Sequence, residues 1–397
     1  MKKLLYVGLG LLLSMSFAQE TRSEDKPNAQ VEWKKQMQDA KTILTDLMPL
    51  VVSDEAFRSP KNHKRISTDV DQLLSFAQAM NHGVAPDSVS ADPTVNLVSD
   101  YFQSNLKSAR SSFKKGRLDH ARFLLLNTTS YCIECHTRTQ AGPHFMGASL
   151  SDTLTKLDPI EKVEYLISVR QYDDALKTIE TTIIEQNKLP LFGAEKLVRY
   201  GLAITVKYLN NPDAALKLLE LSGAAKNLPY FVKDDLQQWK KSVQIWKKEG
   251  GKSKIDSVTQ IMTQAQKLIT SAEEINSKQR SSNAGHVEIL RANALLTGGF
   301  QKKPDQKQTA KMLYLVGQTY QMIPDHLLWT LHESFYASCI QRVPHSPQAK
   351  ECYKAYEESI IMGYSGSSGT HLPPEVMTEL NDLRKLSDPQ NEKIQIK

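Results

Sequence analysis

The stretch Cys132-Ile133-Glu134-Cys135-His136 determines how the rest of this chain is interpreted. The segment before it, Leu118 to Tyr131, places its apolar side chains at helical spacing, so the motif is expected to continue a helix. Residues three and four positions apart share one helix face. The two thiols and the imidazole of the motif should therefore project together.

Two cysteines followed directly by a histidine, in the pattern CxxCH, form an attachment site for haem. The thiols become thioethers on the haem vinyl groups, and the histidine becomes an axial iron ligand. With four cysteines and ten histidines in 397 residues, chance would give this pattern in roughly one such sequence in a thousand. The sequence predicts one covalent haem c on Cys132 and Cys135, with His136 bound to iron.

Two other interpretations of the cysteine pair are open. A thioredoxin-type dithiol site needs a strand before the motif and a βαβ context, whereas helical spacing precedes it here. A structural zinc site needs a second close pair of Cys or His ligands, whereas Cys339 and Cys352 are thirteen residues apart and distant from the motif. Haem attachment is the favoured interpretation.

The first eighteen residues have the form of a secretory signal. Lys2 and Lys3 precede an apolar run over residues 4–14, and Ser16-Phe17-Ala18 has the small-x-small pattern of a cleavage site. We expect cleavage before Gln19 and a periplasmic mature protein, because c-type haem attachment requires an extracytoplasmic compartment. No later segment approaches the ~18 apolar residues that span a bilayer, so no transmembrane anchor is expected after cleavage.

The composition indicates a globular protein, with 40% hydrophobic and 24% charged residues. The formal net charge of +6 includes the two leader lysines and is too small for a nucleic-acid-binding signature. The length suggests two or three domains. The chain contains no HExxH, GxSxG or EF-hand spacing, so no motif supports a hydrolase or a calcium-binding protein.

Four amphipathic segments with short links precede residue 138 and predict an antiparallel four-helix bundle. Gly83 is expected to end the second helix, whereas Asp92-Pro93 is expected to begin the third as a cap followed by an N1 proline. The predicted helices span residues 28–52, 66–82, 93–115 and 118–136 approximately.

A bundle of this length, with its CxxCH motif on the last helix, resembles the class II cytochromes c, the cytochrome c′ family, and their b-type haem-binding relatives. The resemblance covers about Val31 to Arg138 and implies a haem held between the helices with His136 as axial ligand. In low-spin members, a methionine on the first helix is the sixth ligand, and Met37 occupies the matching position here. In cytochrome c′ itself that position is apolar and the iron is five-coordinate.

The residues leave alternatives for each further haem contact. Met37 is a candidate sixth ligand, although methionine on an apolar stripe commonly fills core space. Met48, His144 and Met146 are weaker candidates. Arg138 is a candidate partner for a haem propionate because cations stabilise carboxylates, and a solvated side chain is its ordinary alternative.

The chain beyond the bundle is expected to be an α-helical repeat array, whose first helix begins at the cap Asp158-Pro159. Ala175 and Leu176 follow Gln171-Tyr172-Asp173-Asp174, and a weaker echo lies at 211–216; both segments resemble degenerate tetratricopeptide (TPR) repeats. The predicted fold class is all-α. The predicted units are a signal peptide (1–18), a haem-binding bundle (19–147), TPR-like repeats (148–250) and further helical repeats (251–397).

Cys339 and Cys352 are predicted to form a disulfide. Cys339 falls near the end of one predicted helix and Cys352 early in the next, so an antiparallel pair would bring them within bonding distance. An oxidising compartment favours the bond, which would contribute about 3 kcal/mol. Two separately buried thiols are the alternative.

The leading functional expectation is one-electron transfer by a periplasmic c-type cytochrome, with the repeats docking a redox partner protein. A small-gas (NO or CO) binder or sensor and an assembly protein with structural haem are the alternatives. An enzyme is not expected, since no acid–base pair is identifiable on the distal side of the haem; weak peroxidase-like turnover at an open ferric haem stays an alternative. The family resemblance also allows a homodimer, whereas no nucleic-acid partner is expected.

Overall fold

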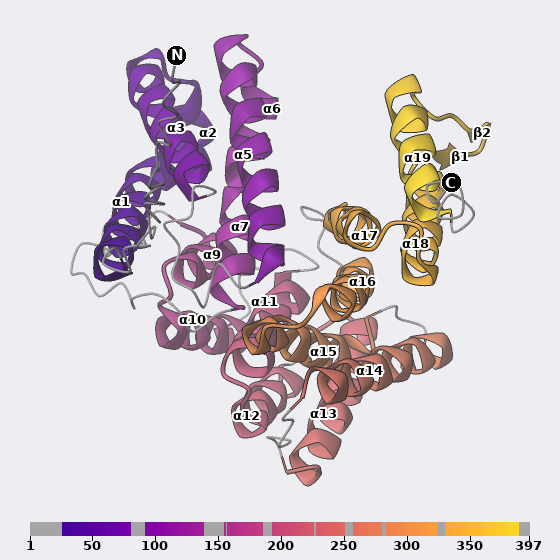
Figure 1. Cartoon of the computed structure of the whole chain (residues 1–397). Helices are drawn as coiled ribbons and strands as arrows, with labels where there is room; N and C mark the ends of the chain where they lie inside the picture. Colours follow the sequence, from indigo (N-terminus) through magenta and orange to yellow (C-terminus); the bar gives the residue numbers. More distant parts are fainter. Residues whose placement is uncertain are drawn as a thin grey trace, which may run out of the picture.

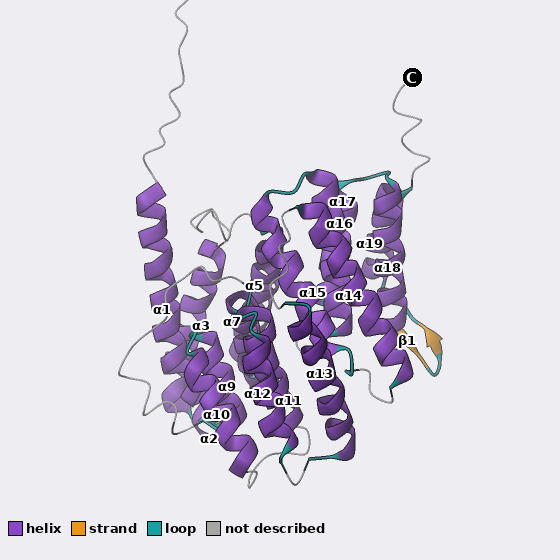
Figure 2. Cartoon of the chain, turned by 90° about the horizontal axis from the view of Figure 1, so that it is seen from below, coloured by secondary structure: helices purple, strands orange, loops and turns teal. Residues whose placement is uncertain are grey.

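The chain is helical over nearly all of the residues described by its structure, a computed structural model (Figures 1 and 2). Those residues are 26–80, 92–138, 155, 157–185, 193–225, 228–250, 257–279, 283–323 and 330–388. Within them the only strands are the exposed antiparallel pair β1 (Ser365–Gly366) and β2 (Gly369–Thr370). The predicted all-α class is confirmed. The predicted signal peptide lies outside the described residues.

Each N-terminal helix packs against the next, and α6 packs back against α1. Helix α1 contacts α3, α3 contacts α5, α5 contacts α6 and α7, and α6 contacts α1. In Figure 1 these helices form the indigo and violet part of the molecule. The described helices of this part are α1 (Lys26–Val52), α2 (Asp54–Arg58), α3 (Pro60–Met80), α5 (Pro93–Lys114), α6 (Leu118–Leu126) and α7 (Thr128–His136).

Three details of this part differ from the sequence-based prediction. Helix α3 begins at Pro60, whereas the predicted second helix begins near residue 66. The short helix α2 was not predicted; it begins where the Ser53 hydroxyl accepts a hydrogen bond from the Ala56 amide at 3.1 Å. The predicted fourth helix is divided into α6 and α7 at Asn127, where ψ is −7°. Asparagine disfavours the helix interior because its side chain competes for backbone hydrogen bonds.

Local capping explains why two predicted helix starts are confirmed. The Asp92 side chain accepts a hydrogen bond from the Thr94 amide at 2.9 Å, and Pro93 follows at the first helical position. Asp158 accepts from the amides of Ile160 and Glu161 as part of a capping box. These interactions are local, so a short sequence is enough to predict them.

The middle of the chain consists of paired helices. Helix α9 contacts α10 and α11, α10 contacts α11 and α12, and α12 contacts α13. A π-helix, η2, continues α11 without a break; such segments are rare and frequently lie at functional sites. The described elements are α9 (Pro159–Ser168), α10 (Tyr172–Glu185), α11 (Gly193–Leu202), η2 (Ala203–Tyr208), α12 (Pro212–Gly223) and α13 (Tyr230–Lys248).

The C-terminal part continues as helices that contact their successors. Cys339 and Cys352 lie on α17 and α18 with their Sγ atoms at bonding distance and their Cα atoms 6.3 Å apart. This separation suits the predicted disulfide, which stays a prediction. The elements are α14 (Val258–Lys278), α15 (His286–Gly299), η3 (Phe300–Lys302), α16 (Gln306–Met322), α17 (Leu331–Arg342), α18 (Pro347–Gly363) and α19 (Pro374–Ser387).

Two large hydrophobic clusters cross the predicted unit boundaries. The first joins buried residues of α1–α7 to those of α14–α19, and α5 contacts α17. At that contact, the Tyr101 hydroxyl donates a hydrogen bond to the Thr330 carbonyl at 3.1 Å. The second cluster joins Ile133 of the motif to α9–α13 and to α15. The predicted unit boundaries stay predictions, and the packing connects the parts of the chain that they separate.

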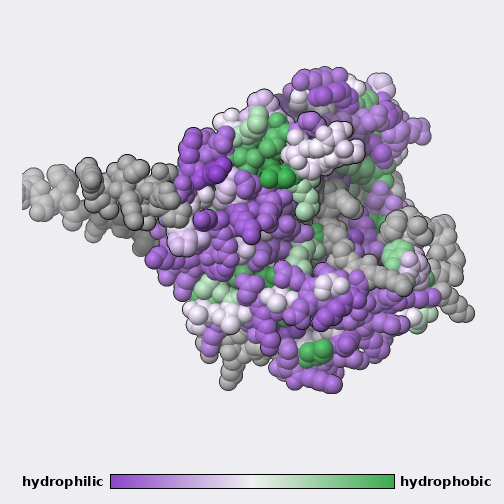
Figure 3. All heavy atoms as spheres, turned by 90° about the vertical axis from the view of Figure 1, so that its right-hand side faces the viewer, coloured by the Kyte–Doolittle hydropathy of each residue, from purple (hydrophilic) through white to green (hydrophobic). Residues whose placement is uncertain are grey.

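The face of the molecule seen in Figure 3 is mainly hydrophilic, with apolar patches between polar ones. Met362, at the end of α18, is the most exposed of the large apolar side chains described, at 73%. Among the described residues, no helix has the length and hydropathy needed to cross a membrane.

Candidate functional site

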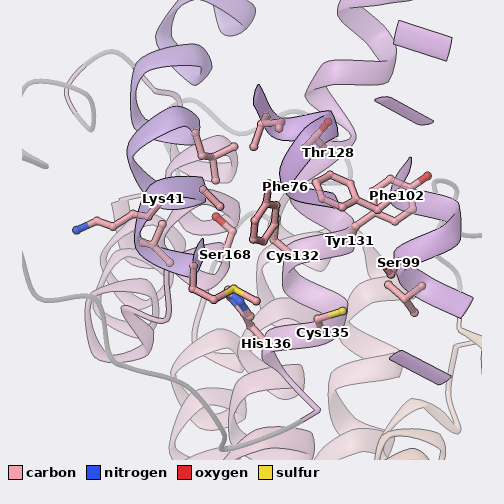
Figure 4. Close-up of a pocket in the computed structure, with 16 residues that line it drawn as sticks. Lys41, Phe76, Ser99, Phe102, Thr128, Tyr131, Cys132, Cys135, His136 and Ser168 are labelled. Atoms are coloured by element: carbon pink, nitrogen blue, oxygen red, sulfur yellow. The ribbon is translucent and has the colours of Figure 1, made fainter. Parts of the chain in front are cut away.

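The CxxCH motif lines a cavity between the N-terminal helices and α9 (Figure 4). The space between its lining residues is about 650 Å³, including space that is open to solvent. Most of its lining is apolar. The lining residues are Met37, Ala40, Lys41, Leu44, Leu73, Phe76, Val98, Ser99, Phe102, Thr128, Tyr131, Cys132, Cys135, His136, Ser168 and Val169.

All three chemically distinctive residues of the motif lie on α7 and line this cavity. Cys132 and Cys135 are free thiols, and His136 is the last residue of the helix. Figure 4 shows the three side chains on neighbouring turns. The spacing of three and four residues places them on one face, as the helical periodicity predicts.

His136 presents a neutral imidazole. Its Nδ1 atom is buried and has no hydrogen-bond partner. Burial lowers the pKa of His136 to about 3, the charge of Arg170 adds to this shift, and the backbone of Ser168 opposes it. A neutral imidazole keeps a lone pair for a metal, so this histidine is in the protonation state that ligation needs.

The two thiols are held in their protonated form. Burial raises the pKa of Cys132 to about 12 and that of Cys135 to about 11. Cysteines that exchange disulfides have lowered pKa values, because the thiolate is the reactive species. These surroundings therefore disfavour the thioredoxin-type interpretation of the pair.

Met37, the predicted sixth ligand, lies on α1 and lines the same cavity as His136. It is half-buried, and its side chain packs against the cluster of Leu44 and Met48. Met48 is buried in that cluster and does not line the cavity. The other two candidates, His144 and Met146, lie outside the described residues. Ligation by Met37 stays a prediction, and its position is compatible with it.

Arg138 does not line the cavity, and its guanidinium has other partners. Its side chain is fully buried, and Nε donates a hydrogen bond to Glu134 Oε1 at 2.6 Å. Its Nη atoms contact the hydroxyls of Thr94 and Tyr320, and Asp92 lies 3.9 Å away. The contact with a haem propionate stays a prediction, and these interactions do not favour it.

The sequence did not predict a buried charge cluster that joins Glu134 of the motif to Lys207 and Arg138. Lys207 Nζ on the π-helix lies 2.9 Å from Glu134 Oε1, and the Tyr320 hydroxyl donates to the same oxygen. Burial by itself would raise the pKa of Glu134, but the charges of Lys207 and Arg138 outweigh it and lower the pKa to about 2. A lysine within an apolar run, Ile204 to Tyr208, was the available signal.

Part of the cavity wall was also missed. Ser168 and Val169, at the end of α9, line the cavity although they lie outside the predicted bundle. Helix α7 contacts α9. Nothing in the sequence near residue 168 marks it as part of a site, because the contact depends on how the helices pack.

The residues present fit a covalently held haem. Two adjacent thiols, a neutral imidazole with an unpartnered nitrogen and a thioether converge on a cavity with mainly apolar walls. Covalent haem c uses two thiols and a histidine, a thioether can serve as the second axial ligand, and an apolar surrounding limits solvent access to the iron. Among the described residues, no group of three or more His, Cys, Asp or Glu side chains is placed to hold a bare metal ion.

Comparison of the chain with known proteins returned no family model, no curated protein and no solved structure that matches it. The functional argument therefore depends on the residues and their geometry.

Proposed function

We propose that this protein is a periplasmic c-type cytochrome that transfers single electrons through one covalent haem. The observation that carries the proposal is the convergence of Cys132, Cys135, His136 and Met37 on one cavity. Bound haem would supply a one-electron ferric/ferrous couple there. The chain would hold the haem through the two thiols, provide His136 as a neutral ligand, and exclude water with apolar side chains.

The proposal includes an arrangement of the chain. Helices α1, α3, α5 and α6–α7 would act as the four-helix haem bundle, and the paired helices from α9 onward as a TPR-like array. The contacts between neighbouring helices support both assignments. Stacked helical pairs offer extended surfaces, so we assign the docking of a redox partner to them.

Haem attachment is tested by expressing the chain in a bacterium that matures c-type cytochromes. The purified, denatured protein should gain the mass of one haem, and a variant with both Cys132→Ser and Cys135→Ser should gain none. A Cys339→Ser variant is the matched control and should keep the haem. A denatured wild-type protein with the mass of the bare chain would contradict the proposal.

Electron transfer and iron ligation are tested by spectroscopy of the loaded protein. We expect a reversible one-electron couple and, if Met37 is the sixth ligand, a low-spin spectrum that becomes high-spin in Met37→Ala. Met48→Ala is the control, because Met48 does not line the cavity. A haem that is not reversibly reduced would exclude the electron carrier.

The apolar lining favours one second candidate, a binder of NO or CO. Leu44, Leu73, Phe76, Val98 and Phe102 surround a space that a small apolar gas can enter. Carbon monoxide separates the two functions: a ferrous spectrum that CO does not change excludes gas binding, and rapid formation of a CO complex supports it.

A further inference from the structure

The turn between α9 and α10, residues 168–172, packs against the C-terminal end of the CxxCH helix. Ser168 and Val169 line the cavity. Val169 belongs to a small buried cluster with Leu44 and Met48 of α1, so the turn also contacts the opposite wall. Arg170 has a φ of 60°, a conformation that is uncommon for a residue other than glycine. The tight turn allows Tyr172 to begin α10 close to α7.

Tyr172 contacts the backbone of His136. Its hydroxyl donates a hydrogen bond to the His136 carbonyl oxygen at 2.9 Å. His136 is the last residue of α7, and the final carbonyls of a helix have no partner within the helix. Tyr172 supplies that partner from an element that follows the motif by 36 residues.

The position of Tyr172 is itself fixed by packing. Its side chain is buried, and its ring lies 4.2 Å from the ring of Tyr208, at an interplanar angle of 34°. The two side chains also share a hydrogen bond. Tyr208 is the last residue of the π-helix. Lys207, the residue before it in the same helix, pairs with Glu134 of the motif. The π-helix thus contacts the CxxCH helix directly through Lys207 and indirectly through Tyr208 and Tyr172.

Residues that orient a metal-binding histidine strongly affect the metal, although they do not touch it. We propose that Tyr172 is a positioning residue of the haem site: it acts through the backbone of His136, and the α9–α10 turn is a structural part of that site. This inference rests on the proposed function, since it assigns a role toward the haem. It also means that residues beyond the four-helix bundle complete the site.

The test compares Tyr172→Phe with wild type in the full-length, haem-loaded protein. The variant keeps the ring stack and loses the hydroxyl, so we expect covalent haem and a wild-type circular dichroism spectrum. We also expect a shifted reduction potential and a broadened ferric electron paramagnetic resonance spectrum, because the axial imidazole would adopt more than one orientation.

Tyr200→Phe is the matched control. The Tyr200 hydroxyl donates to Glu164 Oε1 at 2.7 Å between α11 and α9, away from the cavity lining. This variant loses one tyrosine hydroxyl from the same region, and we expect both its potential and its paramagnetic spectrum to match those of wild type. If Tyr172→Phe does not fold, Tyr208→Phe should show the same changes to a smaller degree.

The possible outcomes are distinct. A Tyr172→Phe or Tyr208→Phe protein with covalent haem, but with the potential and spectrum of Tyr200→Phe, would overturn the positioning role and leave the proposed function intact. A wild-type protein without covalent haem would overturn both. Changes of equal size in the Tyr172 and Tyr200 variants would assign Tyr172 a general structural role instead.

Discussion

Replacing Lys207 by methionine should destabilise the protein strongly. The Lys207 side chain is 3% exposed, and its ammonium lies 2.9 Å from the Glu134 carboxylate, which is itself buried. Methionine keeps most of the side-chain volume and removes the charge. Glu134 would then retain Arg138 and Tyr320 as partners and lose one of its two neighbouring cations.

Breaking a buried ion pair by removing one partner costs about 3–5 kcal/mol. Because Arg138 still contacts Glu134 in the variant, we expect the lower end, a loss of about 3 kcal/mol in the free energy of unfolding. Equilibrium unfolding in urea measures the loss. The double variant Glu134→Gln/Lys207→Met should recover part of it, since it leaves no carboxylate without its ammonium.

The matched control is Lys217→Met on α12. Lys217 pairs with Glu180 at 3.3 Å, but its side chain is 71% exposed. Exposed pairs contribute between zero and about 1 kcal/mol, so this variant should resemble wild type. Two results would contradict this role of the cluster. One is a loss of unfolding free energy in Lys207→Met no larger than in Lys217→Met. The other is a loss in the double variant equal to the sum of the losses in Glu134→Gln and Lys207→Met.

Three further predictions concern the rest of the chain. Burial lowers the pKa of His286 to about 3, so the unfolded state takes up a proton below about pH 6.5 that the folded state does not. The free energy of unfolding should therefore fall as the pH drops from 6.5 toward 3, and His286 should contribute up to about 1.4 kcal/mol per pH unit to this fall. Urea unfolding at several pH values should show a smaller fall in His286→Gln, and an equal fall in both proteins would refute this. In Gly285→Ala, the new methyl group would lie 2.7 Å from the Cα of Ala272, so urea unfolding should reveal a loss of about 1–3 kcal/mol. If Cys339 and Cys352 are bonded, thiol titration of the denatured, unreduced and haem-loaded protein should find no free thiol; two would reject the bond.

The features that the sequence predicted well depend on neighbours in the chain. The starts of α5 and α9 follow from Asp92 and Asp158 with the prolines after them, because capping acts within a few residues. The shared face of Cys132 and His136 follows from helical spacing alone. The helical class follows from repeated apolar positions.

The features that the sequence did not predict depend on distant contacts. Lys207 meets Glu134 across 73 residues, and Ser168 reaches the cavity through the packing of α9 on α7. The π-helix escapes prediction because periodicity analysis assumes 3.6 residues per turn, and one wider turn changes the pattern only slightly. Arg138 illustrates the converse, since its charge alone suggests a propionate partner, whereas its guanidinium pairs with Glu134.

The hydrophobic cluster shared by the N-terminal and C-terminal helices has a consequence for biosynthesis. Its members extend from Leu47 to Leu383, so α5 cannot acquire its contacts with α17 until nearly the whole chain has been made. During synthesis, the apolar side chains of α5 that face α17 therefore stay exposed until α17 has been made. Contacts between such distant segments slow folding, and under the proposed function this delay would keep Cys132 and Cys135 accessible for haem attachment.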